Sequence, residues 1–385
     1  MMARDAAASP GVRYPGEGGG VDVSREQVIA HRIAAQGLHR DGPGTLGCVL
    51  DLGIQDSGAS AAVAVAARSD APVPPTALAW THRGAPHHHR PGELARWSRA
   101  NRPRDDADAA ARLGWSGPEQ RRVGIPALAA IDRAADALAA VVTVPMTKGE
   151  ASTQVTRRLP DALLRECRGC RCTHVNEQLM RLSAAPAGVA IDPDAPTLVL
   201  LPPPRGWVPP GAVTVADLAH LARAVLRVLG PGTPAHVAGF AGTATRVLTA
   251  VWAEVVDAAD LAEVRLDGAA AWLPRQDLDA LADPPAPDPV RLLPPFDPLL
   301  QVRDRELLVP DPDRRRELYR VLGNPGAVLA DGEVVGTWRP RASGRRLALA
   351  VTEFEPWSPD VRARVDEEAE RVAAARGLQP AGVTR

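Results

Sequence analysis

The sequence LAEVRLDGAAAWLP, residues 261–274, consists of two apolar runs on either side of Asp267-Gly268. An Asp-Gly pair in this position is a strong signal for a tight β-hairpin, because both central turn residues must adopt positive φ. Before it, apolar residues recur at helical spacing through TVADLAHLARAVLRVLG, residues 214–230, and shorter segments with helical signals fill residues 233–255. The order of three helices and a hairpin is typical of a winged helix, whose second and third helices form a helix-turn-helix.

Two earlier parts of the chain show the same order of elements with weaker signals. In residues 21–89, Ser24 and Gln27 form a capping box at a helix start, and the apolar stretch ALAWTHRG ends the segment. In residues 118–202, amphipathic helices precede two extended runs around the turn signal DPDAP. The sequence therefore predicts an α+β fold of tandem winged-helix modules (helix-turn-helix plus β-wing). For each module, another small α+β unit is the alternative.

The C-terminal part of the chain changes from a helical to an extended pattern. Residues alternate between apolar and polar types around Asp331-Gly332 and Ser343-Gly344, which predicts an antiparallel sheet or a small barrel. A charged amphipathic segment, 358–377, predicts a closing helix. The expected units are a disordered tail at 1–20, winged helices at 21–115, 116–205 and 206–284, and a β-barrel-like sheet with a helix at 285–375.

The composition excludes several classes of protein. Of 385 residues, 45% are hydrophobic, which is enough for several packed cores, and no stretch is long and apolar enough to span a membrane. The N-terminus lacks the apolar core of a signal peptide, so a cytoplasmic protein is expected. The net charge of −1 does not by itself indicate nucleic-acid binding, but arginine supplies all the basic residues except Lys148. Arginine presents forked donors that suit phosphate, although a genome-wide codon bias explains the same preference.

Candidate DNA contacts lie where these arginines gather. The segment HRGAPHHHR, residues 82–90, is compatible with a wing tip near phosphate, with a plain solvated loop as the alternative. RPRASGRR, residues 339–346, crowns the expected C-terminal hairpin, although charge runs are commonly just solvated faces. In the third unit, TATRVLTAVW is the expected recognition-type helix. The predicted DNA-binding residues are Arg83, His87, Arg90, Arg246, Arg339, Arg341, Arg345 and Arg346.

One cysteine cluster raises the question of metal binding. CRGCRCTH offers Cys167, Cys170, Cys172 and His174 as weak candidate zinc ligands. All four lie in one tight segment without a distant second pair, and the single-residue spacings would strain a closed site with four ligands. Reduced thiols beside a helix start are therefore favoured over zinc, and the sequence predicts no cofactor.

Several segments together resemble a known family. LLPPFDPLLQVRDRELL (292–308), followed by VLADGEVVGTWRPR (328–341), is similar to the C-terminal region of the AlkZ-like winged-helix DNA glycosylases, which unhook alkylated and crosslinked bases. Arg32 and Gln36 in RIAAQGL, the segment GIQDSG and the segment WTHRGAPH supply the matching N-terminal features. The resemblance covers roughly residues 21–375. It implies tandem winged helices plus a β-barrel, curled around a concave basic channel.

The catalytic signature of that family is Q-x-Q, or Q-x-D in one branch, and this chain departs from it. If Gln55 is the second glutamine, Gly53 takes the first place; if it is the first, Ser57 takes the third. Gln55 with Asp56 is the predicted catalytic pair, because a glutamine carbonyl orients a water and a carboxylate opposes the positive sugar of an oxocarbenium-like transition state. The alternative is that Asp56 or Ser57 only caps the helix that starts near Gly58.

The expected function is binding of double-stranded DNA by a monomer that resembles base-excising glycosylases and acts in DNA repair. A non-catalytic DNA-binding protein or transcriptional regulator with the same fold is the first alternative. A scaffold that binds RNA or protein is the second alternative. Base release that depends on Gln55 would separate the enzyme from both.

Overall fold

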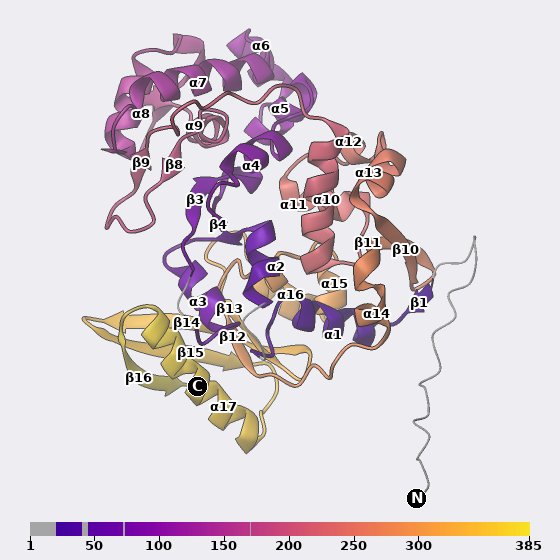
Figure 1. The fold of residues 1–385 in the computed structure, drawn as a ribbon. Coiled ribbons are helices and arrows are strands. Elements are labelled where there is room, and N and C mark those ends of the chain that lie inside the picture. Colours follow the sequence, from indigo (N-terminus) through magenta and orange to yellow (C-terminus); the bar gives the residue numbers. More distant parts are fainter. Residues whose placement is uncertain (1–20, 41–44, 72–73, 170) are drawn as a thin grey trace, which may run out of the picture.

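The computed structural model describes residues 21–40, 45–71, 74–169 and 171–385. Within these residues the fold is mixed α and β, with helices packed around four sheets (Figure 1). The prediction of a fold that combines α and β elements is therefore confirmed in its coarse form. None of the described helices combines the length and the apolar character that crossing a membrane would require. The predicted tail at 1–20 lies outside the described residues.

The third predicted unit begins with the expected helices. α10 (Val215–Leu229) starts at a capping box in which Thr214 and Asp217 each bond the backbone of the other. α11 (Pro234–Ala241) starts with the proline that favours a first helical turn, after Thr233 as the cap. Both helix starts were visible in the sequence because a cap involves only residues three positions apart.

The segment 243–255, predicted as one helix, is divided into two in the structure. α12 (Thr245–Thr249) and α13 (Trp252–Ala259) are separated at Val251, whose φ of −133° breaks the helical run. The apolar periodicity of the segment continues across this break, so the prediction of a single helix was wrong for a reason that the pattern does not reveal.

The hairpin predicted at Asp267-Gly268 is confirmed. β10 (Leu261–Leu266) pairs with β11 (Ala269–Pro274), and φ is 50° at Asp267 and 76° at Gly268. Both turn residues thus hold the left-handed conformation that an Asp-Gly turn requires. β1 (Val21–Val23) adds a parallel strand to this hairpin, so the start of the described chain lies beside the third unit.

α1 (Arg25–Ala35) also packs on the third unit. It starts at the predicted capping box, and its buried residues Ile29 and Ile33 share a hydrophobic cluster with Leu221 and Val225 of α10. Hydrophobic packing therefore joins segments that the sequence assigned to different units. The four-unit division of the chain and the winged-helix classification stay predictions.

A sheet of six short strands connects the first and second predicted units. Its order is β2–β4–β3–β8–β9–β5, so the predicted hairpin of β8 and β9 is confirmed and lies in one sheet with strands of the first unit. The strands are Ile54–Gln55 (β2), Ala77–Trp80 (β3), Pro86–His89 (β4), Met146–Thr147 (β5), Ala190–Ile191 (β8) and Val199–Leu201 (β9). The helices of this half are Thr45–Leu52 (α2), Ser60–Ala66 (α3), Leu94–Ala100 (α4), Asp106–Leu113 (α5), Gly117–Val123 (α6), Ala127–Val141 (α7), Lys148–Thr156 (α8) and Glu177–Ala184 (α9).

The C-terminal strands form an open sheet, which corrects the prediction of a barrel. The order is β12–β13–β14–β15–β16, and the edge strands β12 (Arg291–Leu293) and β16 (Gln379–Thr384) do not pair with each other. α17 (Pro359–Ala375) covers one face of the sheet in a hydrophobic cluster with Trp338 and Leu349 (Figure 1). Because this helix fills the apolar face, the sheet need not close on itself. The central strands are Gly326–Ala330 (β13), Glu333–Ser343 (β14) and Arg346–Glu353 (β15).

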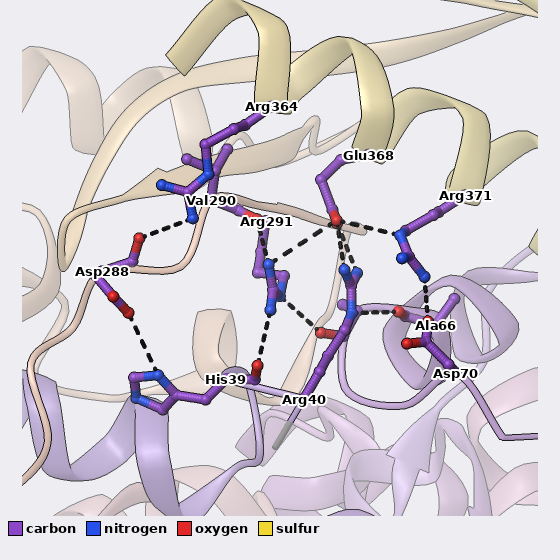
Figure 2. A network of polar contacts seen from close by, with 11 residues as sticks. His39, Arg40, Ala66, Asp70, Asp288, Val290, Arg291, Arg364, Glu368 and Arg371 are labelled. Carbon is purple, nitrogen blue, oxygen red and sulfur yellow. Dashed lines mark hydrogen bonds and ion pairs between the residues drawn. The ribbon is translucent and has the colours of Figure 1, made fainter. Parts of the chain in front are cut away.

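A network of charged side chains fastens α17 to the N-terminal part of the chain (Figure 2). Glu368 of α17 accepts two hydrogen bonds from Arg40, at 2.5 and 2.7 Å, and lies 3.9 Å from Arg291. Arg291 in turn donates to the carbonyl oxygens of Ala67 and His39, at 3.1 and 3.2 Å. Glu368 is only 6% exposed, so water screens these contacts little and they fix the C-terminal sheet beside the N-terminal segment.

Candidate active site

Gln55 ends β2, which follows α2 after a single connecting residue. That residue, Gly53, has φ of 97°, and a Cβ there would come within 2.3 Å of the His89 ring. Position 53 therefore has no room for a glutamine, so the family signature would begin at Gln55 and have Ser57 in its third place. Ser57 is exposed, and its N–H donates to Ser60 Oγ. Only one glutamine of the signature is present.

The Gln55 side chain is 8% exposed and is bonded to Arg83. Its Oε1 accepts a hydrogen bond of 3.0 Å from Arg83 Nη2, and the same nitrogen donates to Gln301 Oε1 at 2.6 Å. One guanidinium thus joins two glutamines that lie far apart in the sequence. Gln301 Nε2 donates to the Phe296 carbonyl at 2.8 Å, which fixes the orientation of the Gln301 amide.

Arg83 is held from several sides. It adopts φ of 58°, an uncommon value for a long side chain, within the 3-10 turn His82–Gly84 (η1). Its Nη1 donates to the Phe240 carbonyl, and its guanidinium carbon lies 4.9 Å from the centroid of the Phe240 ring. Burial, and after it the charge of Arg303, lowers the Arg83 pKa to about 9. The group stays protonated at neutral pH and gives Gln55 a fixed cationic partner.

These side chains lie in the wall of a cavity of about 200 Å³. A cavity of about 150 Å³ holds a benzene molecule, so there is room here for a single flat ring system. Phe296 is 37% exposed with φ of 63°, a conformation that persists only where the surroundings impose it. The wall contains three arginines and no carboxylate, so it is positively charged. The lining residues are Gln55, Arg83, Ala85, Phe296, Leu300, Gln301, Arg303, Arg305, Leu318, Tyr319, Asn324 and Pro325.

Asp56 follows Gln55 in sequence but does not line this cavity. Its Oδ1 accepts a hydrogen bond of 3.1 Å from the Ala61 N–H in the first turn of α3, and its Oδ2 lies 4.0 Å from His88 Nε2. Asp56 thus satisfies a backbone N–H at the start of α3, as a capping side chain does, although Ala59 occupies the N-cap position. The structure therefore does not bring the Asp56 and Gln55 side chains together at one site.

Three of the four histidines in the segment 82–90 are buried rather than exposed at a wing tip, whereas Arg90 at its end is exposed. His82, His87 and His89 are at most 1% exposed, and their ring centroids lie within 6.0 Å of one another. Thr81 Oγ1 lies 3.2 Å from His87 Nδ1 and 2.9 Å from His89 Nε2. The predicted contact of His87 with DNA phosphate conflicts with this burial, because β4 is an inner strand that turns the side chain into the core.

The buried histidines make the free energy of unfolding depend on pH. Burial lowers the His82 pKa to about 3 and holds the pKa values of His87 and His89 well below the ordinary value. Unfolded histidine titrates near about pH 6.5, so below that pH the unfolded chain binds more protons than the folded one. The contribution of these histidines to the free energy of unfolding is therefore fully present above about pH 6.5. It is lost as the pH falls, by up to about 1.4 kcal/mol per pH unit for each histidine.

We therefore expect the urea midpoint of unfolding to fall steeply between about pH 6.5 and 5, where most carboxylates are still ionised. Urea titrations followed by circular dichroism at several pH values measure this slope. If the midpoint stays constant or rises on acidification, these histidines are not uncharged in the core of the folded protein.

The remaining predicted DNA contacts are not gathered at the cavity. Arg90 lies 2.7 Å from Asp51, and Arg246 of α12 lies 2.6 Å from Asp105, so a carboxylate of the protein already pairs with each guanidinium. Arg339 is different, because its Nη2 donates at 2.8 Å to the carbonyl of Gly323, in the loop that borders the cavity.

The tip of the β14–β15 hairpin carries a cluster of exposed arginines. Arg341, Arg345 and Arg346 are exposed, and none of them takes part in an ion pair with the described residues. The register places Arg346 opposite Ser343, so Arg341 and Arg346 share with Arg339 the face of the hairpin that is turned away from the α17 core. This face and the border of the cavity meet at Arg339.

The cysteine cluster forms no metal-ligand group within the described residues. Cys167 and Cys172 are a cross-strand pair in a two-stranded hairpin, and His174 Nδ1 donates to the Val175 carbonyl at 2.6 Å. Cys170 lies outside the described residues.

Sequence reasoning missed several residues of the cavity. Gln301, Arg303 and Arg305 lie in a segment whose likeness to the glycosylases was noted, but nothing local connects them with Gln55. Gln301 ends the 3-10 turn Pro298–Gln301 and Arg305 begins the helix Arg305–Leu308, so no regular spacing in the sequence placed these three side chains on one side.

Comparison with known proteins identifies first the fold and then the family. The structure is similar to that of Streptomyces sahachiroi DNA glycosylase AlkZ, with a TM-score of 0.72 and 21% identity over 94% of this chain and 100% of that chain. The likeness shows that the two share the fold of a DNA glycosylase. The sequence model of the family described as DNA glycosylase AlkZ-like matches residues 61–375. The chain belongs to the AlkZ-like DNA glycosylase family, which confirms the resemblance inferred from its motifs. Among curated protein sequences, no relative matches the chain.

Proposed function

We propose that this protein is a DNA glycosylase that releases alkylated bases from double-stranded DNA. The observation that carries the proposal is Gln55, a glutamine of the family signature, fixed by Arg83 in the wall of a cavity with room for one base. The family membership of the chain and the name of its structural relative support the same class of activity.

Release of an alkylated base depends more on the positioning of the reacting groups than on strong acid or base catalysis. An N7- or N3-alkylated purine is already a cation and a good leaving group, so the protein has to orient a water and stabilise the oxocarbenium-like sugar. Gln55 Oε1 is taken up by Arg83, and within the described residues Gln55 Nε2 makes no hydrogen bond with the protein. Gln55 Nε2 is thus available to donate a hydrogen bond to the water or to the departing base, whereas the carbonyl oxygen, the expected acceptor for the water, is bonded to Arg83.

The arginines of the cavity suit a nucleotide rather than a bare base. Arg83, Arg303 and Arg305 would repel a positive sugar if they acted alone. Arg303 and Arg305 match the phosphates on either side of a lesion, and these phosphates would then lie beside the developing positive charge of the sugar.

A non-catalytic DNA-binding protein is the second candidate, and one observation favours it. No carboxylate lines the cavity, and Asp56 contacts the start of α3 instead. The sugar cation would therefore have no anion of the protein close to it. Such a protein would recognise damaged duplex DNA without releasing a base.

The proposal extends to how DNA is held. The order α10, α11, the divided third helix α12 and α13, and then the β10–β11 hairpin supports a winged helix in the third unit, with α12 as the start of the recognition-type helix. Phosphate contacts would come from Arg246 and from the arginines of the β14–β15 hairpin. We propose a cytoplasmic monomer that wraps damaged duplex DNA.

Base release from a duplex with one 7-methylguanine tests the proposal, using the purified full-length chain. Free 7-methylguanine in solution supports the glycosylase. Binding of the duplex without release supports the second candidate. Absence of binding at low salt contradicts both.

Replacing Arg341, Arg345 and Arg346 together by alanine is expected to weaken binding of all duplex sequences alike. Each lost phosphate contact reduces the slope of log K against log salt by about 0.9, so the triple variant loses up to about 2.7. Anisotropy titrations between about 50 and 200 mM salt measure the slope. Arg122→Ala, on α6 and paired with Glu119, serves as the control. A triple variant with the slope of the unmodified protein would remove this hairpin from the interface.

A further inference from the structure

Two adjacent aliphatic side chains are exposed to solvent in a loop that borders the cavity with Gln55. Val321 is 99% exposed and Leu322 is 87% exposed, in the loop between α16 (Pro312–Leu318) and β13. No other large hydrophobic residue of the described chain is as exposed as either of them. An exposed apolar pair next to a binding cavity indicates contact with a partner.

The loop that carries the pair forms part of the rim of the cavity. Tyr319, Asn324 and Pro325 line the cavity, and Val321 and Leu322 lie between them in the chain. The same short loop thus contributes lining residues to the cavity and carries the exposed pair.

The loop is anchored at both ends. The Tyr319 ring packs beneath the Arg305 guanidinium, 4.1 Å from it, and burial raises the pKa of the Tyr319 hydroxyl. At the other end, Gly323 has φ of 67° and its carbonyl accepts the 2.8 Å hydrogen bond from Arg339. The apolar pair is thus presented on a fixed turn.

The surroundings of the pair are basic. Arg320 precedes it in the chain, and the hairpin face with Arg339, Arg341 and Arg346 begins where Arg339 contacts the loop. An apolar tip flanked by guanidinium groups matches duplex DNA, whose stacked bases are apolar and whose backbone is a polyanion.

We propose that Val321 and Leu322 form a wedge that enters the duplex and fills the space left when a base moves out of the stack into the cavity. Proteins that unstack DNA insert apolar side chains between base steps in this way, and a base must leave the stack before its glycosidic bond can be reached inside a closed pocket. The choice of duplex DNA as the partner of this wedge rests on the proposed function. Its two residues position the DNA and do not touch the reacting bond.

Fluorescence of 2-aminopurine, placed next to a 7-methylguanine in a duplex, tests the wedge without relying on catalysis. Saturating unmodified protein is expected to raise the fluorescence, because an unstacked 2-aminopurine is brighter. Val321→Ser combined with Leu322→Ser is expected to abolish the rise although the duplex is still bound. Val208→Ser, at a position 79% exposed, is the matched control and keeps the rise. An equal rise with the double variant, or no rise with saturating unmodified protein, overturns the wedge.

Base release separates the wedge from the proposed activity. The double variant is expected to release 7-methylguanine from duplex DNA at least about tenfold more slowly, and from the same lesion in single-stranded DNA at the unmodified rate, because a single strand has no duplex stack to open. Equal losses on both substrates would overturn the wedge. If the unmodified protein unstacks 2-aminopurine through the wedge but releases no base, the proposed glycosylase activity fails and the wedge stands.

Discussion

Replacing Gln55 by alanine is expected to slow release of 7-methylguanine from duplex DNA by about 10²–10³-fold, the loss typical of one preorganised polar group at a reacting centre. The substitution removes the amide that reaches the cavity and leaves Arg83 with Gln301 and the Phe240 carbonyl as partners. The wall should therefore keep its shape, and DNA affinity should change little. Single-turnover assays with excess protein measure the chemical step apart from binding.

Asp56→Asn is the matched comparison, because it changes the neighbouring residue of the predicted pair. Asp56 contacts the start of α3, and the amide oxygen of asparagine can accept the same hydrogen bond from the Ala61 N–H, so we expect base release close to the unmodified rate and little change in the free energy of unfolding. The opposite pattern, with Gln55→Ala active and Asp56→Asn inactive, would make the carboxylate the catalytic group.

Replacing Asp297 by asparagine is expected to lower the free energy of unfolding by about 3–5 kcal/mol. Asp297 and Arg68 are fully buried and joined by two hydrogen bonds of 2.8 Å, and Arg68 also donates to Gln36 Oε1 at 2.8 Å. Asparagine keeps the volume of the side chain but leaves the Arg68 charge without its counter-ion in the core. The shift of the urea midpoint at constant slope measures the loss.

Two further variants make this prediction sharp. Asp313→Asn removes a carboxylate that is 77% exposed and paired with Arg316, and it is expected to cost no more than about 1 kcal/mol. Arg68→Met with Asp297→Leu replaces the buried pair by apolar groups and is expected to recover much of the lost stability. If the Asp297→Asn variant is as stable as Asp313→Asn, the ion pair of Arg68 and Asp297 contributes little to the free energy of unfolding.

The motif residues that revealed the family serve largely as structural ties. Arg32 binds Asp304 at 2.7 Å, and Gln36 meets Arg68 and through it Asp297 of the PPFDP segment. These buried contacts join the N-terminal helix to the segment that lines the cavity. They also hold in place the segment that carries Gln301, which meets Gln55 at Arg83.

Sequence reasoning succeeded where a few neighbouring residues determine the backbone. The Ser24 and Thr214 caps and the Asp267-Gly268 turn were predicted correctly, since caps and tight turns depend on residues at most three or four positions apart. The alternation of the C-terminal strands was predicted correctly as well. The same alternation fits a closed barrel and an open sheet covered by a helix, so the sequence did not distinguish them.

Local sequence patterns were enough to establish the caps, the tight turns and the family, and they singled out Gln55 as a candidate. The packing of distant segments brings Gln55, Arg83 and Gln301 into one cavity, leaves Asp56 outside it and buries His87, and no sequence pattern showed this. The physical reason is the range of the interactions. Caps and turns form within a few residues, whereas a cavity is defined by the packing of segments from distant parts of the chain, and no local pattern records which of them will meet.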